Sequence, residues 1–152
     1  ETLEIPPRPR LLVLDAVQDP GNAGTMLRTA AALGAAATLA APGTVDLWNA
    51  KVVRSAMGAL FYYPALSVSW DALDGMLADR GIPLWGADAT GQAVDTIAPP
   101  TAVALAVGNE GAGLSLDARA RCARLVGIPL APGIESLNVA VAAGILLHHF
   151  RE

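Results

Sequence analysis

The strongest constraint on the fold of this 152-residue chain is its alternation of short apolar runs with longer helical patterns. The runs that predict buried strands are Leu11–Val17, Ala36–Ala40, Ala65–Val68, Pro83–Ala87, Val103–Val107 and Leu125–Leu130. The predicted helices are Ala23–Leu33, Asn49–Met57, Asp71–Asp79, Ser115–Cys122 and Leu137–Phe150. Strands separated by helices require right-handed crossovers, so the pattern predicts an α/β fold: a mostly parallel sheet with helices on both faces.

Length and composition limit the number of domains and the class of protein. The chain suits one domain, placed here at residues 11–152, and its hydrophobic fraction of 53% excludes a disordered protein. Residues 1–10 contain three prolines and are expected to form an extended lead-in or linker. Because the chain opens with Glu1 rather than Met, we expect an upstream segment outside these 152 residues.

The single cysteine, Cys122, excludes a disulfide framework or a cysteine-based zinc site. It fits a reducing cytosol, so we expect a cytoplasmic protein. The longest apolar run, Val139–Leu147, falls short of the roughly 18 residues of a membrane span, and no membrane partner is expected.

The net charge of -4 argues against a protein that holds nucleic acid by bulk electrostatics, because phosphate contacts need Lys or Arg. All the basic residues except Lys51 are arginine, which offers phosphate a rigid fork of donors. The composition therefore permits RNA as a partner without indicating it.

Three polar or glycine-rich loops follow predicted strands, and ligands of parallel α/β sheets bind beyond the carboxyl ends of strands. In the first loop, Asn22 is expected either to cap the following helix or to meet a ligand. Arg28 is the one charge of that helix, and a half-buried arginine needs a phosphate, carboxylate or carbonyl partner. Six residues turn an ideal helix by about 240°, so the two side chains converge on one ligand only if Asn22 precedes the helix.

The second loop, Gly108–Gly113, has glycines that allow a ligand close to the backbone, although three glycines alone more often form a tight turn. It matches neither a Walker A loop nor a dinucleotide fingerprint. Its Glu110 would repel a phosphate but can orient an arginine or a ribose hydroxyl. In the third loop, Ser136 is expected to cap the last helix and Asn138 either to bind a ligand or to satisfy a buried loop.

The last helix is apolar all round and must be covered on every side. A partner subunit or other helices of the same chain can cover it, and the pattern leaves both open. At its end, His148 and His149 are interpreted as a solvated pair rather than a metal site.

Other residues give no site. Ser55 and Ser67 lack the His and Asp of a hydrolase triad. The tryptophans are interpreted as packing residues: Trp48, Trp70 and Trp85.

Taken together, three stretches resemble the SPOUT class of RNA methyltransferases, specifically the SpoU/TrmH branch. They are Asn22–Ala30 (NAGTMLRTA), Leu105–Leu114 (LAVGNEGAGL) and Ile128–Ile145 (IPLAPGIESLNVAVAAGI), and Arg54–Ala59 (RSAMGA) is also similar. The resemblance covers about residues 11–150. Three motifs in order, each after a strand, are specific where one alone is not.

The resemblance implies a C-terminal trefoil knot that binds S-adenosylmethionine, and a homodimer that completes the site across its interface. The implied reaction is methyl transfer to a ribose 2′-hydroxyl of RNA, with rRNA favoured over tRNA and no metal. The implied catalytic residues are Arg28, Asn22, Glu110, Ser136 and Asn138. The implied cofactor-binding residues, acting largely through backbone groups, are Gly108, Ile128, Leu137 and Thr90.

A guanidinium stays protonated above pH ~12, so we interpret Arg28 as an electrostatic stabiliser and phosphate anchor rather than a general base. A substrate phosphate or water would then accept the proton. Many relatives carry an upstream RNA-binding domain that we do not find here, and we expect the isolated chain to bind cofactor but methylate weakly.

Three alternatives remain at this point. The enzyme can act on a base rather than a ribose, or the chain can be a non-catalytic relative that binds RNA. Without the resemblance, the sequence also fits a nucleotide-binding α/β domain that uses Gly108–Gly113 for phosphates.

Overall fold

The structure is a computed structural model that describes residues 2–151, and it is built from six strands and five α-helices within that range. The strands are β1 (Arg10–Leu14), β2 (Ala37–Ala40), β3 (Ala65–Ser67), β4 (Leu84–Ala93), β5 (Val103–Val107) and β6 (Arg124–Gly127). The helices are α1 (Pro20–Ala32), α2 (Ala50–Ser55), α3 (Trp70–Arg80), α4 (Leu116–Arg121) and α5 (Val139–His149). Two short 3₁₀ turns are η1 (Ala59–Phe61) and η2 (Val94–Thr96).

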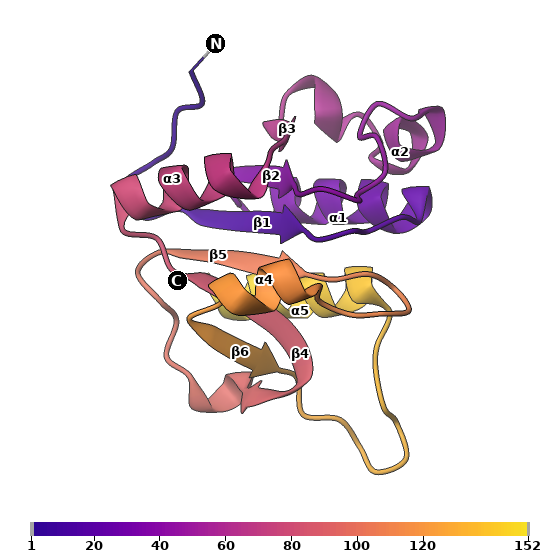
Figure 1. Ribbon diagram of the computed structural model, residues 1–152. Helices are drawn as coiled ribbons and strands as arrows, with labels where there is room; N and C mark the ends of the chain where they lie inside the picture. The colour runs from indigo at the N-terminus through magenta and orange to yellow at the C-terminus, as the bar shows by residue number, and fades with distance from the viewer. Residues whose placement is uncertain (1, 152) are drawn as a thin grey trace.

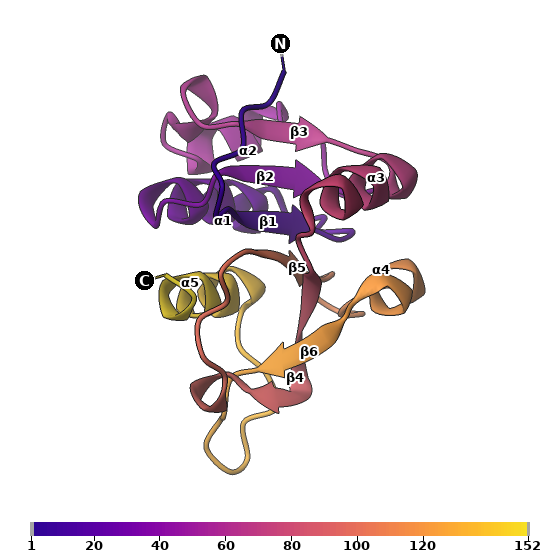
Figure 2. The same cartoon turned by 90° about the vertical axis from the view of Figure 1, so that its left-hand side faces the viewer.

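The six strands form one sheet in the order β3-β2-β1-β5-β4-β6, and every pair of neighbouring strands is parallel. Helices α1 and α5 cover one face and α3 and α4 the other (Figures 1 and 2). The predicted α/β class and the helices on both faces are therefore confirmed. All strand carboxyl ends point to one edge of the sheet, as parallel pairing requires.

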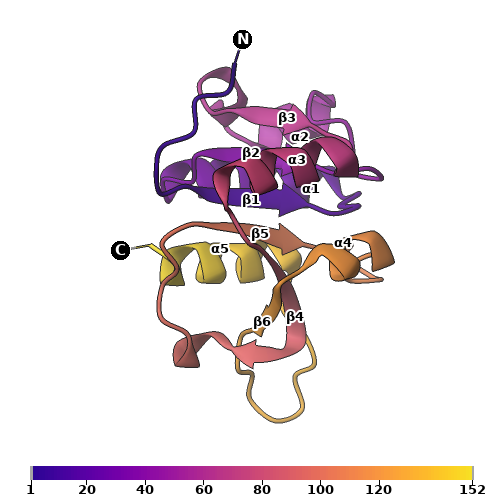
Figure 3. The same cartoon turned by 60° about the vertical axis from the view of Figure 1, so that its left-hand side comes forward.

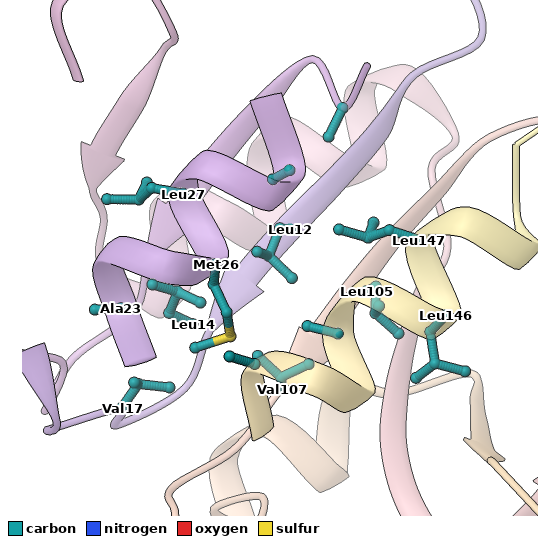
Figure 4. Packing of buried hydrophobic residues seen from close by; sticks show 14 of the residues in the cluster. Leu12, Leu14, Val17, Ala23, Met26, Leu27, Leu105, Val107, Leu146 and Leu147 are labelled. Atoms are coloured by element: carbon teal, nitrogen blue, oxygen red, sulfur yellow. The ribbon is translucent and has the colours of Figure 1, made fainter. Parts of the chain in front are cut away.

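Strand alternation divides the core into two layers. In β1, Leu12 and Leu14 face α1 and α5, whereas Leu11 and Val13 pack with α3. The larger layer joins α1 to α5 across the sheet centre, through fully or almost fully buried side chains such as Met26 and Leu146. Figure 4 shows this packing. Both central strands are buried on both faces, which explains their continuous apolar sequences.

Helix α1 begins at Pro20, three residues before the predicted start. Asp19 is the N-cap and accepts a hydrogen bond from the Asn22 N–H (2.9 Å), while Pro20 occupies the first turn, where a missing N–H costs nothing. The expectation that Asn22 caps this helix is wrong, because Asn22 lies inside its first turn.

The cap of α5 is also not the predicted one. Asn138, not Ser136, is the N-cap, and its Oδ1 accepts hydrogen bonds from the N–H groups of Ala140 and Val141. Ser136 remains in the loop before the helix, where it is exposed.

Strand β4 is longer than predicted and contains an irregularity. It pairs with β6 at Trp85–Ala87 and again at Gln92–Ala93, and residues 88–91 between them pair with nothing in the ladder. Such a bulge bends the strand and redirects its side chains. Here it brings Asp88 and Ala89 to the carboxyl edge of the sheet.

The tryptophans divide into two groups. Trp85 is buried against Phe150 and Trp70 is half-buried, as predicted. Trp48 is 58% exposed, so the expectation that it is a packing residue is wrong. The last helix also keeps an uncovered side, where Val141 and Ile145 are 51% and 41% exposed.

Candidate functional site

A cavity of about 640 Å³ lies beyond the carboxyl ends of β4, β5 and β6. Its wall is formed by the bulge after Ala87, the glycine loop after β5, and the long loop 128–138 between β6 and α5, which Figure 3 shows below the sheet. Ligand sites of parallel sheets form at this edge. Two of the three predicted loops thus line one cavity, and the first contributes Asn22.

The glycine loop is a tight turn whose shape depends on the absence of side chains. Asn109 and Gly113 exchange two backbone hydrogen bonds of 2.9 Å each, which folds the loop back on itself. A Cβ at Gly108 would lie 2.3 Å from the carbonyl carbon of Gly113, closer than any real contact. Glycine at 108 is therefore required by close backbone approach rather than by an unusual φ angle.

Side chains of the glycine loop hold it against the turn that follows β1. The Glu110 carboxylate accepts hydrogen bonds from the backbone N–H groups of Gln18 (3.3 Å) and Asp19 (3.0 Å). Asn109 donates to the carbonyl of Ala16 (2.8 Å). Because Ala16 has a left-handed φ of 56°, this turn is strained and these contacts help to keep its shape.

Asp15 holds the end of the same loop. Its carboxylate is 1% exposed and accepts hydrogen bonds from the Ser115 N–H (2.6 Å) and hydroxyl (2.9 Å). Ser115 in turn caps α4. Hydrogen bonds from Asn109, Glu110 and Ser115 thus hold the glycine loop against the segment that follows β1.

The pKa of Glu110 lies below its ordinary value. Partial burial opposes ionisation and raises the pKa, but backbone N–H groups of Glu110 itself, Asp19 and Gln18 and the side chain of Asn22 together outweigh it. Glu110 is therefore a carboxylate at neutral pH. It can accept, but not donate, a hydrogen bond at the cavity mouth.

Asn22 and Asn138 meet across 116 positions of sequence. The Asn138 side-chain amide donates to the Asn22 Oδ1 (3.0 Å), while its own oxygen caps α5. Both residues line the cavity, together with Glu110 and Ser136. Four of the five predicted catalytic residues thus gather in one chain.

Three of the predicted cofactor-binding residues, Gly108, Ile128 and Leu137, line the cavity. They lie outside every helix and strand, and their backbone groups make no hydrogen bond with the rest of the described chain. Free N–H and C=O groups facing a half-apolar cavity suit a ligand with an aromatic base and a polar tail. S-adenosylmethionine has this chemistry and its size suits the cavity, so the residues present fit the implied cofactor.

Thr90 lies beside the cavity rather than on its wall. Its hydroxyl and N–H both donate to the Asp88 carboxylate, and Asp88 lines the cavity. Its role as a cofactor residue stays a prediction.

Sequence reasoning missed Asp88 and Arg119, which both line the cavity and form an ion pair with each other. Hydrogen bonds from Thr90, followed by those from Arg119, lower the pKa of Asp88 despite partial burial. The sequence contained a pattern that could have identified Asp88, because this residue directly follows a predicted strand, as the three loops do. Only the unexpected bulge in β4 brings it into the site.

Arg28 is the predicted catalytic residue that the structure does not bring into the cavity. It is exposed rather than half-buried, and its side chain makes no hydrogen bond or ion pair within the described residues 2–151. Since Asn22 lies inside α1, the six-residue step to Arg28 turns the helix by about 240°, which leaves the two side chains about 120° apart around its axis. Asn22 faces Asn138, and Arg28 points to another side of α1.

Residues 2–151 contain neither a membrane-spanning helix nor a group of side chains suited to a metal ion. The helices in that range are too short or too polar to cross a membrane. His, Cys, Asp and Glu side chains there form no group of three that could hold a metal ion.

Comparison with known proteins identifies the family of this arrangement. The family model described as the SpoU rRNA Methylase family matches residues 9–148. A relative in Bacillus subtilis (strain 168), 23S rRNA (guanosine(2553)-2′-O)-methyltransferase RlmP, is 41% identical over 143 residues, which are 93% of this chain and 58% of that protein. The 23S rRNA (guanosine-2′-O-)-methyltransferase RlmB of Neisseria meningitidis serogroup B is 37% identical over 145 residues, 94% of this chain and 58% of that protein.

A solved structure is also similar, the SpoU methyltransferase AviRb from Streptomyces viridochromogenes in complex with the cofactor AdoMet. It matches with a TM-score of 0.88 and 34% identity over 97% of this chain and 58% of that one. The chain thus spans somewhat more than half the length of these relatives. With this match in sequence and fold, the chain belongs to the SpoU family of RNA methyltransferases.

Proposed function

We propose that this protein transfers a methyl group from S-adenosylmethionine to a ribose 2′-hydroxyl of rRNA. The observation that carries the proposal is the meeting of Asn22, Asn138 and Glu110 at a cavity whose loops leave backbone groups free for a cofactor. The relatives named above support it, since both rRNA enzymes are named as 2′-O-methyltransferases.

S-adenosylmethionine, when bound, supplies an electrophilic methyl carbon on a sulfonium. Gly108, Ile128 and Leu137 would hold this cofactor, and the ribose oxygen would accept its methyl group while the hydroxyl proton leaves to a substrate phosphate or water. The Asn22–Asn138 pair and the Glu110 carboxylate can orient the ribose hydroxyls, and positioning supplies much of the rate of such a displacement. A guanidinium near the forming alkoxide stabilises its charge.

We further propose that the guanidinium comes from Arg28 of a second copy in a homodimer. Within one chain Arg28 lies outside the cavity, is exposed and has no partner among the described residues. The exposed Val141 and Ile145 on α5 leave an apolar strip beside α1 for the second copy to cover. The C-terminal trefoil knot, the cytoplasmic location and the domain limits 11–152 with an upstream RNA-binding domain also remain proposals.

Calorimetric titration with S-adenosylmethionine, ATP and NAD tests the cofactor, and we expect binding of the first alone. Methylated total RNA from a strain lacking the gene is then hydrolysed in alkali, because a 2′-O-methyl group protects the neighbouring phosphate from cleavage. Alkali-resistant dinucleotides are expected. A methyl group on a base, or no methyl transfer, would favour the alternatives.

A complementation experiment tests the shared site. Arg28→Ala and Asn138→Ala proteins, each inactive alone, are mixed and allowed to exchange subunits. A mixed dimer has one site with both residues intact, so the mixture should regain up to a quarter of wild-type turnover. If the mixture stays inactive although exchange is shown, Arg28 does not act across an interface.

A further inference from the structure

The proposed function uses residues of α1 and of the cavity. It gives no role to a group of large, exposed apolar side chains that flank α2 in the sequence. Around this helix, Trp48 is 58% exposed, Met57 68%, Phe61 75% and Tyr62 76%. The Trp48 and Phe61 rings contact edge to face, with centroids 6.3 Å apart. Single exposed apolar residues are ordinary, but four gathered in fifteen positions of sequence form a patch that needs a reason.

Two cations lie on the same short helix as this patch. Lys51 and Arg54 are exposed, three residues apart and therefore neighbours on one helix face, and their side chains make no hydrogen bond or ion pair within residues 2–151. Other arginines are engaged, such as Arg119 with Asp88 and Arg121 with Asp74. The nearest acid in sequence is Asp46, whose carboxylate accepts from the Trp48 N–H.

The charge distribution separates residues 20–69, which contain this patch, from the rest of the chain. Residues 20–69 contain three cations and one acid, a net charge of +2, whereas the remaining residues contain seven cations and thirteen acids, a net charge of -6. A polyanion would therefore meet the chain at residues 20–69. Arg28 is the third cation of the segment.

The patch is connected to Arg28 by close packing. The Ser55 hydroxyl of α2 donates to the Pro20 carbonyl at the start of α1 (3.1 Å), and a Cβ at Gly24 would lie 1.7 Å from that hydroxyl. The side of α1 that meets α2 is thus the side of Gly24, and Arg28 follows one turn later on the same stripe. Figure 1 shows α2 beside the amino-terminal half of α1.

We infer that Trp48, Phe61 and Tyr62, flanked by Lys51 and Arg54, bind a single-stranded segment of the RNA substrate next to Arg28. Aromatic faces stack on unpaired bases, and the two cations meet the phosphates between them. This inference rests on the proposed function, in that it names where the substrate lies outside the cavity. It assigns the patch to RNA, and a second copy of the chain is the competing occupant.

The test measures binding of a fluorescein-labelled uridine dodecamer to the 152-residue chain by anisotropy, at several salt concentrations. Phe61→Ala and Trp48→Ala should each weaken binding about tenfold, the effect of losing one stacked base. Lys51→Ala and Arg54→Ala should each make the slope of log K against log salt shallower by about 0.7. Arg80→Ala and Leu116→Ala, exposed residues on the opposite face, are the controls and should change neither quantity.

Two further measurements separate the outcomes. A 4-thiouridine RNA should cross-link to the tryptic peptides 29–51 and 55–80, and light scattering should show the same mass for wild type and the Phe61 and Trp48 variants. A lower mass in the variants would assign the patch to a second copy and overturn the inference. So would wild-type protein that binds S-adenosylmethionine but no oligonucleotide at low salt, a result that leaves the proposed cofactor intact.

Discussion

The cavity and the outer face of α1 and α2 contrast in the atoms that they offer to a ligand. At the cavity, the free groups are mainly backbone atoms of loops, and side chains such as Glu110 and Asn109 hold those loops in place. On the outer face, the free groups are long side chains that have no hydrogen-bond or ion-pair partner among residues 2–151, Arg28 and Arg54 among them. One chain is therefore enough to shape the cavity, whereas the charged face offers groups that the described chain itself does not use.

The largest effect expected from this contrast is on turnover. Arg28→Lys should lower it by about 10²–10³-fold, the usual cost of removing one group that stabilises developing charge. Arg28 does not line the cavity of its own chain, and its proposed role is toward the ribose rather than the cofactor, so the calorimetric Kd for S-adenosylmethionine should stay within twofold. Arg80→Lys is the control, and near-wild-type turnover of Arg28→Lys would refute the role.

The next effect concerns the backbone of the cavity. Gly108→Ala places a methyl group 2.3–2.4 Å from the backbone of Gly113 and Leu114, so the loop must open at a cost of about 1–3 kcal/mol. Both the free energy of unfolding in urea and S-adenosylmethionine affinity should fall.

The matched control is Gly75→Ala in α3, where a Cβ meets nothing within 4 Å. In that helix interior alanine should stabilise by about 0.5–1 kcal/mol. If Gly108→Ala were equally harmless, the loop would not be shaped by close backbone approach.

A smaller effect is expected from changing Asn138, whose side-chain amide joins the third loop to Asn22. Asn138→Ala removes the cap of α5 and should cost about 1 kcal/mol of stability. Asn138→Asp keeps the capping oxygen but loses the N–H that reaches Asn22, so its melting temperature should stay near wild type while turnover falls. Equal turnover in the Asp variant and the wild type would show that the amide contact serves only structure.

The smallest effect is on pH dependence. The pKa of Glu110 is lower in the folded chain than its ordinary value of 4.5, so its ionised form stabilises the fold above that pH. This contribution is lost as the pH falls through the lower, folded value. Urea unfolding of wild type and Glu110→Gln should therefore differ at pH 7 and converge toward pH 3, and a difference that grew with acid would reverse this interpretation.

The sheet could be predicted because its central strands are continuous apolar runs, buried on both faces. Val103–Val107 matches β5 residue for residue. The far part of β4 could not be predicted, since residues 88–93 contain polar and small side chains and pair only after a bulge. That bulge is a tertiary feature, set by β6 rather than by local sequence.

The candidate site was predicted in part for similar reasons. Asn22, Glu110, Ser136 and Asn138 meet because their motifs follow strands of one parallel sheet. The environment of Arg28 was not predicted, because its aliphatic neighbours suggested half-burial, whereas the helix turns it to solvent. The exposure of Trp48 was also not predicted, since a single tryptophan outside a periodic apolar pattern does not indicate whether its side chain is buried or exposed.

The contact of Glu110 with the first loop has a consequence for sequence drift. The carboxylate holds the main-chain amide of Gln18 and makes no use of its side chain. This contact therefore sets no requirement on the side chain at position 18, and proline is the residue that would abolish it because it carries no amide hydrogen. If the contact is maintained in related sequences, we expect position 18 to vary and Glu110 to be retained.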